Sequence, residues 1–537
     1  MSTAGEAAAE CDPAQSMQTS SRILLNTATN WAARLTTAVV SLLLVPFLLQ
    51  ILGKQAYGLI ALVGVIVSMT AIADLGLRGA MSRQLAEQVA RKDAQRFNEL
   101  FSSGVLYFAM VGTIGAAACF MLTPLLARAF NVSDDLFPDA VFLIRWFGSA
   151  SILFSFLLPA CNAVLVANNR FDVPNNIGTV IGLAQGLTIF GVLATTGAGL
   201  RGWAAVMLTS MALQVLLSWR FARKIWPDLR LRWSYVRRDA FASLFSLGGK
   251  LFLLQLTGLL AVHADPIILT RILGPASVAL YRPAAILSTS FQGFVNALSE
   301  QLHPLATAYH TTERLKELQS ILLRGTRYTL LMGIPVCVLL GIFAEPITRV
   351  WLSRSLGDEY RITAMVLGGW ALIDLATYAA GSQWPVLLGM NRLNFVIWTQ
   401  LPSAVVNIVV SVILVRYTTL GVVGVVVPTV VIGLLRRPVM VVYTAMVVGL
   451  RPREYFVQSY LRPLLVLLVL AAAAGCIMAV APPRTLMGLL TASALIGALW
   501  VACCWLLGFD EQDRRSFREL LVRVRTAAVR GARSREL

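Results

Sequence analysis

The stretch LTTAVVSLLLVPFLLQIL (residues 35–52) decides the fold, and PLLVLLVLAAAAGCIMAVA (residues 463–481) has the same character far along the chain. Each is predominantly apolar and long enough to cross roughly 30 Å of hydrocarbon as an α-helix. A backbone in hydrocarbon must satisfy its own hydrogen bonds, which helices and closed barrels achieve. Because the apolar residues come in long blocks and not in alternation, we expect an all-α polytopic membrane protein.

The composition of the whole chain agrees with this expectation. Of the 537 residues, 57% are hydrophobic and 13% are charged, whereas soluble domains carry about 25% charged residues. The net charge is +18. In a membrane protein an excess of lysine and arginine marks cytoplasmic loops, so we expect no nucleic-acid partner. The seven cysteines form no CxxC pair and only three histidines occur, so we expect no metal site and no cofactor.

Charged or Pro/Gly-rich breaks divide the chain into about fourteen expected membrane-spanning helices. An even number places both ends of the chain on one side. The segment 223–239 (RKIWPDLRLRWSYVRRD) and the region 514–535 are rich in arginine, and positive residues mark the cytoplasmic side. We therefore expect both termini in the cytoplasm. The expected spans are 23–51, 57–81, 99–124, 139–167, 177–196, 202–222, 244–272, 277–303, 325–350, 362–388, 395–416, 421–448, 462–481 and 486–508.

The two basic clusters are expected to bind anionic lipid headgroups, because such clusters beside a span are attracted to the negative cytoplasmic leaflet. The C-terminal cluster could instead bind a protein partner, as charged tails do. The first 21 residues are polar and lack the features of a signal peptide. We expect them to form a disordered cytoplasmic tail.

Short motifs recur at a nearly constant offset of roughly 220 residues, which indicates an internal repeat. Ile51-Leu52-Gly53 recurs as Ile272-Leu273-Gly274, and Asn169-Arg170 recurs as Asn391-Arg392. Each repeat would contain six spans, so both would enter the membrane in the same sense and form two lobes around a central cavity. The expected domains are the tail 1–21, the N-lobe 22–222, the basic linker 223–243, the C-lobe 244–448, two extra spans in 449–508 and the basic cytoplasmic tail 509–537.

Polar side chains follow one face of the expected span 277–303. Polar groups in hydrocarbon are costly, so a whole stripe of them is expected to line a hydrated cavity. The spacing of the stripe fits a helix, and Asn30 and Arg34 take the same spacing on the first expected span. The stripe comprises Arg282, Thr289, Gln292, Asn296, Glu300 and His303.

We interpret five cations within the expected spans as a path for an anion. Guanidinium groups suit phosphate, because they bind two oxygens at once and stay charged. Other interpretations remain open. Arg78 could pair with Asp74 along one helix, and the long side chains nearest the surfaces could extend to lipid headgroups. The five cations are Arg34, Arg78, Arg145, Lys250 and Arg282.

Three acids within the expected spans are candidates for coupling to H⁺ or Na⁺, since intramembrane acids often mark ion pathways. They are Asp265, Glu300 and Asp374. Asp265 precedes Pro266 and could instead cap a broken helix.

Three short motifs resemble a known family. The stretch 51–59 (ILGKQAYGL), the stretch Ala73-Asp74-Leu75-Gly76-Leu77 and the repeated Asn-Arg turn resemble the Wzx-type polysaccharide transporters. These form one branch of the multidrug/oligosaccharidyl-lipid/polysaccharide exporter superfamily. The resemblance implies a flippase in the bacterial cytoplasmic membrane that moves an undecaprenyl-pyrophosphate-linked oligosaccharide outward by alternating access. It also implies a cavity cation at Arg34, and a polysaccharide polymerase and glycosyltransferases as partners.

Several other functions compete with this one. Many polysaccharide flippases have twelve spans, and the two extra spans expected here are similar to those of the lipid II flippases. A cation-coupled drug antiporter of the same superfamily would want acids in its cavity, which the five cations oppose. A membrane glycosyltransferase or polymerase would need a large outer loop or a cluster of catalytic acids, and the sequence indicates neither. We therefore expect a transporter and not an enzyme.

Overall fold

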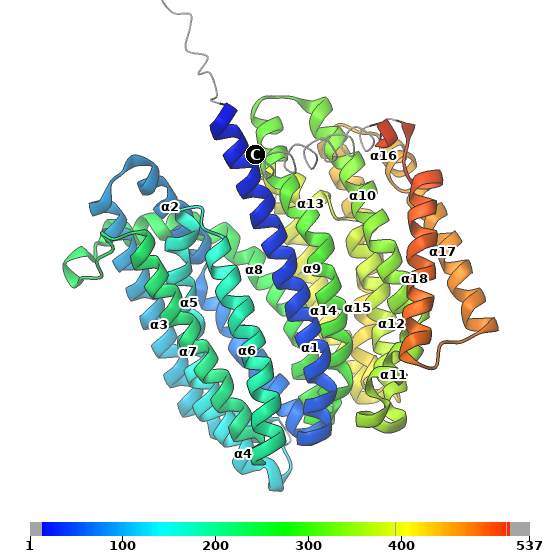
Figure 1. The fold of residues 1–537 in the computed structure, drawn as a ribbon, viewed down its shortest axis with the longest axis horizontal. Helices are drawn as coiled ribbons and strands as arrows, with labels where there is room; N and C mark the ends of the chain where they lie inside the picture. The colour runs from blue at the N-terminus through cyan, green and yellow to red at the C-terminus, as the bar shows by residue number, and fades with distance from the viewer. Residues whose placement is uncertain (1–12, 131, 393, 512, 516–537) are drawn as a thin grey trace, which may run out of the picture. The chain divides into compact units, whose positions relative to one another are not determined.

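A computed structural model describes the backbone of residues 13–130, 132–392, 394–511 and 513–515. Side chains are described over the same residues except 13–34, 71, 246–255, 257 and 259–262. Within this part of the chain every regular element is a helix, as the sequence predicts. Figure 1 shows long helices joined by short turns.

The chain divides into two compact units. The first unit comprises the chain up to Leu52 together with Leu62–Leu259, and the second comprises Gly53–Ala61 together with the chain from Leu260 onward. Helix α8 (Arg238–Leu273) therefore begins in the first unit and ends in the second. The helices that begin in the first unit, besides α8, are α1 (Pro13–Met69), α2 (Leu77–Arg91), α3 (Ala94–Ala129), α4 (Phe137–Phe142), α5 (Ser149–Ala167), α6 (Asp172–Thr196) and α7 (Gly199–Ile225).

The second unit holds the remaining helices. They are α9 (Pro275–Thr311), α10 (Leu315–Ile342), α11 (Ala344–Leu356), α12 (Tyr360–Tyr378), α13 (Gln383–Gly389), α14 (Asn394–Tyr417), α15 (Val423–Val447), α16 (Pro452–Ser459), α17 (Leu461–Val480) and α18 (Leu486–Cys503). Single 3₁₀ turns lie at Thr70–Asp74, Asp134–Leu136, Trp233–Tyr235 and Gly357–Glu359, and π-helical turns lie at Leu143–Gly148 and Cys504–Gly508.

Ten helical segments of the described residues are long and apolar enough to cross a membrane, or up to eleven if a bent pair counts as one span. This establishes a multi-span membrane protein, while the expected count of fourteen stays a prediction. Part of the difference lies in α1. Its segment Leu35–Asp74 counts once, although Gly53 (φ 80°, ψ 168°) interrupts the helix between the expected spans 23–51 and 57–81.

The backbone repeats its unusual conformations at the offset found in the sequence. Gly274 (φ 87°, ψ 170°) has nearly the dihedral angles of Gly53 (φ 80°, ψ 168°). Asn169 and Asn391 both lie in the left-handed region, with φ of 56° and 55°. Lys92 and Glu313 form a third such pair, each with φ of 56°. Left-handed backbone is costly for residues with a Cβ, so the two non-glycine pairs, together with the matching glycines, support a common origin of the two segments.

Two groups of packed helices carry most of the described structure (Figure 1). In the first unit α3, α5 and α7 pack against one another, and Gly112 of α3 allows close approach of Phe156 of α5. In the second unit α10 packs against α9, α12 and α17, and α17 pairs with α18. Buried residues of α10, α17 and α18, among them Ile334, Leu470 and Ile496, belong to one core cluster.

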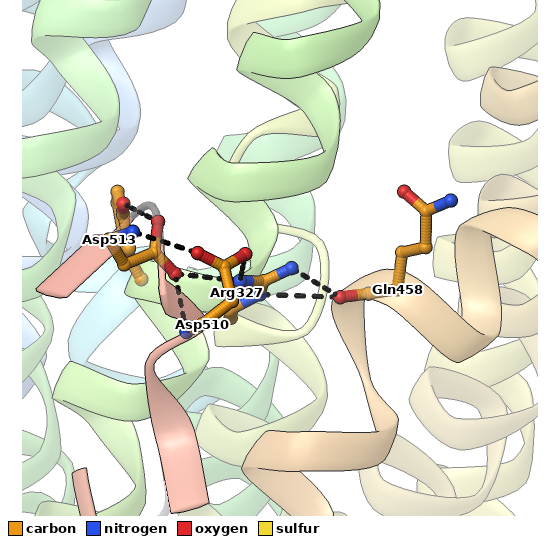
Figure 2. Close-up of polar contacts among 5 residues, drawn as sticks. Arg327, Gln458, Asp510 and Asp513 are labelled. Carbon is orange, nitrogen blue, oxygen red and sulfur yellow. Dashed lines mark hydrogen bonds and ion pairs between the residues drawn. The ribbon is translucent and has the colours of Figure 1, made fainter. Parts of the chain in front are cut away.

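A buried ion-pair network connects Asp510 and Asp513 to α10 (Figure 2). Arg327 Nη1 lies 2.7 Å from both Asp510 Oδ2 and Asp513 Oδ2, and its Nη2 donates to the Gln458 carbonyl oxygen at 2.8 Å. Tyr328 donates to the second Asp513 oxygen at 2.6 Å. Because Arg327 lies on α10, the network holds the residues that follow α18 to α10.

Candidate substrate cavity

A cavity of about 450 Å³ lies inside the second unit. Its wall combines a stripe of α9, the junction of α12 and α13, and one turn of α15. Every lining residue belongs to the second unit, so its description needs no other part of the chain. The lining residues are Asn296, Ser299, Glu300, His303, Thr377, Ala380, Gly381, Trp384, Pro385, Leu388 and Arg437.

Helix α9 supplies the polar side of the cavity. It begins with Pro275 directly after Gly274, and proline is well suited to the first position of a helix because its missing N–H would have no partner there. Asn296, Glu300 and His303 of the predicted stripe line the cavity. The adjacent helical positions Val295 and Ala297 are buried, so α9 is amphipathic here, as the sequence predicts.

The stripe continues beyond the cavity as a buried hydrogen-bond network. The Gln292 amide donates to Asp374 Oδ1 at 2.6 Å, and the Ser288 hydroxyl donates to Asp374 Oδ2 at 2.8 Å. Asp374 is fully buried on α12. The network therefore ties α9 to α12 next to the cavity, through two residues that the sequence had singled out separately.

The broken span of α11–α13 forms a second wall. The segment Ala344–Tyr378 and α13 meet at an angle of 44°. The turn between them is held because Ser382 donates to the Leu322 carbonyl oxygen at 3.0 Å, while Thr329 donates to the Tyr378 carbonyl oxygen at 2.9 Å. The bend brings Trp384 to the cavity wall. Transporters often build substrate sites from such discontinuous helices.

Arg437 is a cavity cation that the sequence reasoning missed. It lies on α15 beside Arg436 and Pro438, and its Nη2 donates to Thr377 Oγ1 at 3.0 Å. The signal was present, because Arg436-Arg437 interrupts an otherwise apolar stretch from 421 to 448. Charged residues at such a position usually face a cavity or a partner, and Arg437 lines the cavity.

The remaining predicted residues of the second unit lie elsewhere on α8 and α9. Asp265 is buried on α8 and accepts a hydrogen bond from Tyr281 Oη at 3.0 Å. Arg282 lies one residue further along α9, and its charge acts on the buried Tyr57. Neither residue lines the cavity. Asn30, Arg34 and Lys250 lie outside the residues whose side chains are described.

In the first unit Arg78 forms an ion pair with Asp74, which was one of the two interpretations of Arg78. Its Nε lies 3.4 Å from Asp74 Oδ2, and its Nη2 donates to the Ser155 carbonyl oxygen at 3.3 Å. Asp74 is buried, whereas 42% of the Arg78 side chain stays exposed. The two positive φ values at Leu75 and Gly76 end the 3₁₀ turn there and start α2, which places Arg78 on its first turn.

Arg145 lies among aromatic side chains of the first unit. Its guanidinium carbon is 5.1 Å from the centre of the Phe120 ring, and Phe120 packs edge-on against Trp146. Both aromatic residues are exposed. Aromatic residues concentrate where membrane and water meet, and both interpretations of Arg145, in an anion path or extended to lipid headgroups, stay predictions.

The cavity offers a cation, an acid, a histidine, an amide and an exposed indole within one space. Such a set can bind an anionic group at Arg437 and hydroxyl groups at Asn296 and Glu300. The described residues contain no group of three or more His, Cys, Asp or Glu that could hold a metal ion.

Comparisons with known proteins agree with this architecture. The family model described as "Polysaccharide biosynthesis protein" matches residues 47–358. Membrane protein EpsK of Bacillus subtilis, described as uncharacterized, is 21% identical over 451 residues, which is 82% of this chain and 87% of EpsK. "Probable flippase AglR" of Haloferax volcanii is 22% identical over 349 residues, covering 63% of this chain and 68% of AglR.

Two solved structures share the fold. The lipid II flippase MurJ, in an inward closed conformation, aligns with a TM-score of 0.68 at 15% identity and covers 89% of this chain and 98% of MurJ. An inward-facing multidrug resistance transporter of the MATE family aligns with a TM-score of 0.63 at 15% identity over 79% of this chain and 98% of that transporter.

Proposed function

Since the chain belongs to the polysaccharide biosynthesis protein family, a family of flippases in the multidrug/oligosaccharidyl-lipid/polysaccharide exporter superfamily, we propose that it moves an undecaprenyl-pyrophosphate-linked oligosaccharide across the bacterial cytoplasmic membrane. The substrate would enter from the cytoplasmic leaflet and leave to the outer leaflet by alternating access. We further propose that both termini lie in the cytoplasm. A polysaccharide polymerase and glycosyltransferases would act on the same glycan.

The observation that carries this proposal is the mixed lining of the cavity in the second unit. Arg437 supplies the charge that a diphosphate needs, and its guanidinium can bind two phosphate oxygens at once. Asn296, Glu300 and His303 supply the hydrogen bonds that sugar hydroxyls need. Trp384 offers a flat apolar face beside them, and pockets with such a combination of aromatic and polar groups bind amphipathic ligands.

We further propose that the five predicted cations form a path for the diphosphate across the membrane. In the inward-open state the diphosphate would first meet Arg34 and Lys250, and it would leave outward past Arg282. Arg78 and Arg145 would contribute charge from the first unit. Arg78 remains partly exposed while it pairs with Asp74, so it retains donors for an anion.

The decisive experiment is translocation in proteoliposomes that hold the purified protein and one labelled substrate. Transfer to the other leaflet is measured as loss of protection from a membrane-impermeant glycosidase. We expect transfer of a polyprenyl-diphosphate oligosaccharide. We expect Arg437→Gln to slow it by roughly ten- to hundredfold, because a charge-assisted hydrogen bond contributes about 1.5–3 kcal/mol.

The matched control is Arg453→Gln, since Arg453 is exposed on α16 and does not line the cavity. This variant should translocate like the unaltered protein. Melting temperatures of both variants in detergent separate a binding defect from a folding defect. Normal translocation by a folded Arg437→Gln protein would contradict the role of the cavity.

A second candidate is a lipid II flippase, and the observation that favours it is the helix pair α17–α18 beyond the repeated part of the chain. The same proteoliposomes loaded with lipid II distinguish the two substrates. A third candidate, a cation-coupled drug antiporter, is tested by uptake of a fluorescent organic cation, which the cationic cavity should disfavour. Faster transfer of lipid II than of the oligosaccharide would overturn the proposed substrate.

A further inference from the structure

Several hydrogen bonds hold the segment between α7 and α8 against α3. Asn98 of α3 donates to the Asp228 carbonyl oxygen at 2.9 Å and accepts from the Arg230 amide at 2.8 Å. Ser103 accepts from the Arg237 amide at 3.1 Å. Asn98 and Ser103 are buried, so their polar groups are committed to the backbone of this segment.

Apolar contacts and an ion pair complete the attachment. The Trp226 ring stacks on Phe97 with ring centres 4.5 Å apart, and Leu229 is buried. At the far end Asp239 Oδ2 lies 2.6 Å from Arg96 Nη1. The segment 226–239 is therefore fixed on the first turns of α3, and we refer to it as the α7–α8 loop.

The attachment places this loop at the depth of the lipid headgroups. Helix α3 has 36 residues and is roughly 54 Å long, whereas the hydrocarbon of a bilayer is about 30 Å thick. For an upright helix centred in the bilayer, each end of α3 extends roughly 12 Å beyond the hydrocarbon. The loop reaches back along α3 as far as Ser102, which donates to the Arg230 carbonyl oxygen at 3.3 Å. Ser102 lies eight residues after the first residue of α3, which again corresponds to roughly 12 Å.

The outward face of the loop combines apolar and cationic side chains. Leu231 is 51% exposed and Trp233 is 77% exposed. Exposed cations flank both residues. Three acids lie nearby: Asp239 is paired with Arg96, Glu99 is paired with Arg96 and lies 3.8 Å from Arg237 Nε, and Asp228 is exposed. The exposed cations are Arg223, Lys224, Arg230, Arg232, Arg237 and Arg238.

From these observations we infer that the α7–α8 loop is a preformed binding site for anionic phospholipid headgroups of the membrane in which the protein lies. Trp233 and Leu231 lie in the boundary between headgroups and acyl chains, where amphipathic aromatic rings are favoured. Arg230 and Arg232 bind headgroup phosphates, because basic segments beside a span are attracted to anionic lipids. The site shares no residue with the cavity lining and does not depend on which substrate is moved.

Charge and depth together favour lipid over a protein partner. A protein bound here would have to displace headgroups that already surround the first turns of α3. The loop also needs no folding on binding, because its backbone is already fixed by Asn98, Ser102 and Ser103. A fixed loop at this depth meets the lipid surface in every molecule.

The test places a fluorescent label on the loop. Trp233→Cys is made in a chain whose seven native cysteines are replaced, and the cysteine carries an environment-sensitive dye. The protein is reconstituted in nanodiscs of neutral phosphatidylcholine, with or without phosphatidylglycerol. We expect phosphatidylglycerol to shift the emission to shorter wavelength and to lower quenching by aqueous iodide severalfold.

Two double variants separate the site from general charge effects. Arg230→Gln with Arg232→Gln should abolish the effect of phosphatidylglycerol. Arg451→Gln with Arg453→Gln removes two exposed arginines at the same spacing in the second unit and should leave the effect intact. Equal quenching in neutral and anionic nanodiscs would overturn the inference.

Two further measurements test whether the site binds a soluble diphosphate or a protein in place of lipid. Soluble pyrophosphate at constant ionic strength should not reverse the protection, and reversal would assign the site to a diphosphate ligand. Added cell extract should give no protection in neutral nanodiscs. Protection by extract protein alone would overturn the lipid site in favour of a protein partner.

Discussion

At the scale of single residues, Asp374 concentrates the polar chemistry of the second unit. It is fully buried, and both of its oxygens accept hydrogen bonds, from Gln292 at 2.6 Å and from Ser288 at 2.8 Å. A buried carboxylate next to a cavity is suited to carry an ion. The network also links α9 to α12, so ion binding at this position would act directly on the helices that form the cavity wall.

We therefore predict that Asp374→Asn uncouples transport from its driving ion. The amide preserves the size of the side chain but removes its charge, so an imposed H⁺ or Na⁺ gradient should no longer accelerate translocation in proteoliposomes. Transfer down the substrate's own gradient should fall less. The exposed acid Asp358 gives the control, since Asp358→Asn should keep the full response. An unchanged response in Asp374→Asn would remove this residue from the coupling pathway.

The second prediction at the scale of single residues concerns the pKa of Asp510. This residue lies beyond the last described span. Burial raises the pKa of Asp510, but the hydrogen bond and the charge of Arg327 outweigh burial and lower the pKa from 3.8 to about 2. The folded protein therefore favours the ionised carboxylate. Its contribution to stability is complete above a pH of about 4 and is lost as the pH falls towards about 2.

The measurement is the difference in melting temperature between the unaltered protein and Asp510→Asn, taken in detergent across this pH range. The difference should be largest near pH 5 and should shrink as the pH falls through the window between the two pKa values. A difference that stays constant down to a pH of about 2 would show that the ionised form of Asp510 is not what Arg327 stabilises.

At the scale of elements, the most demanding contact is made by Gly58 of the motif 51–59. A Cβ on Gly58 would lie 1.9 Å from the carbonyl oxygen of Pro275, at the start of α9. A backbone atom cannot turn aside as a side chain can. The glycine of the motif therefore has a physical role, because it lets α1 pass directly against the first turn of α9.

We predict that Gly58→Ala lowers stability by about 1–3 kcal/mol, the usual cost of overpacking. Gly64→Ala in the same helix is the matched control, since a Cβ there meets nothing within 4 Å. The control should be neutral or should gain up to about 1 kcal/mol, because alanine favours a helix over glycine. Chemical or thermal unfolding in detergent measures both, and equal effects would contradict the close contact.

The elements also show what sequence patterns could and could not predict. Long apolar blocks predicted the helices, and the motif around Gly53 predicted the break within α1, because both signals are local. The polar stripe of α9 was visible from its spacing, and Asn296 and Glu300 do line the cavity. The pairing of Gln292 with Asp374 was not visible, because it depends on how α9 packs against α12.

Two features were not visible in the sequence, for a common physical reason. Arg437 was absorbed into an apolar span, although its charge should have marked that span as unusual. The basic segment 223–239 was expected to bind anionic lipid headgroups, which stays a prediction, and its composition does not reveal that Asn98 and Ser103 hold the backbone of the α7–α8 loop. In both cases the feature depends on a hydrogen bond to a residue far away in the sequence. Average hydropathy does not indicate such a bond.

At the scale of the whole molecule, α17, α18 and the described residues after them are structurally continuous with α10. Helices α17 and α18 share a core with α10, but packing between helices in lipid lacks the hydrophobic driving force that acts in water. The Arg327 network of Figure 2 supplies a polar attachment in addition. Only 8% of the Arg327 side chain and 2% of the Asp513 side chain are exposed, so neither charge can turn to solvent.

The last prediction follows from this burial and compares two shortened chains. A chain that ends after residue 515 keeps Asp510 and Asp513 and gives the reference melting temperature. A chain that ends after residue 508 loses both carboxylates and leaves Arg327 buried without them. Removing one side of a buried ion pair costs about 3–5 kcal/mol, and this chain should melt at a clearly lower temperature. Adding Arg327→Met to the shorter chain should recover part of the loss, because an apolar side chain of similar length needs no carboxylate. Identical melting of the two shortened chains would mean that apolar packing alone holds α17 and α18 in place.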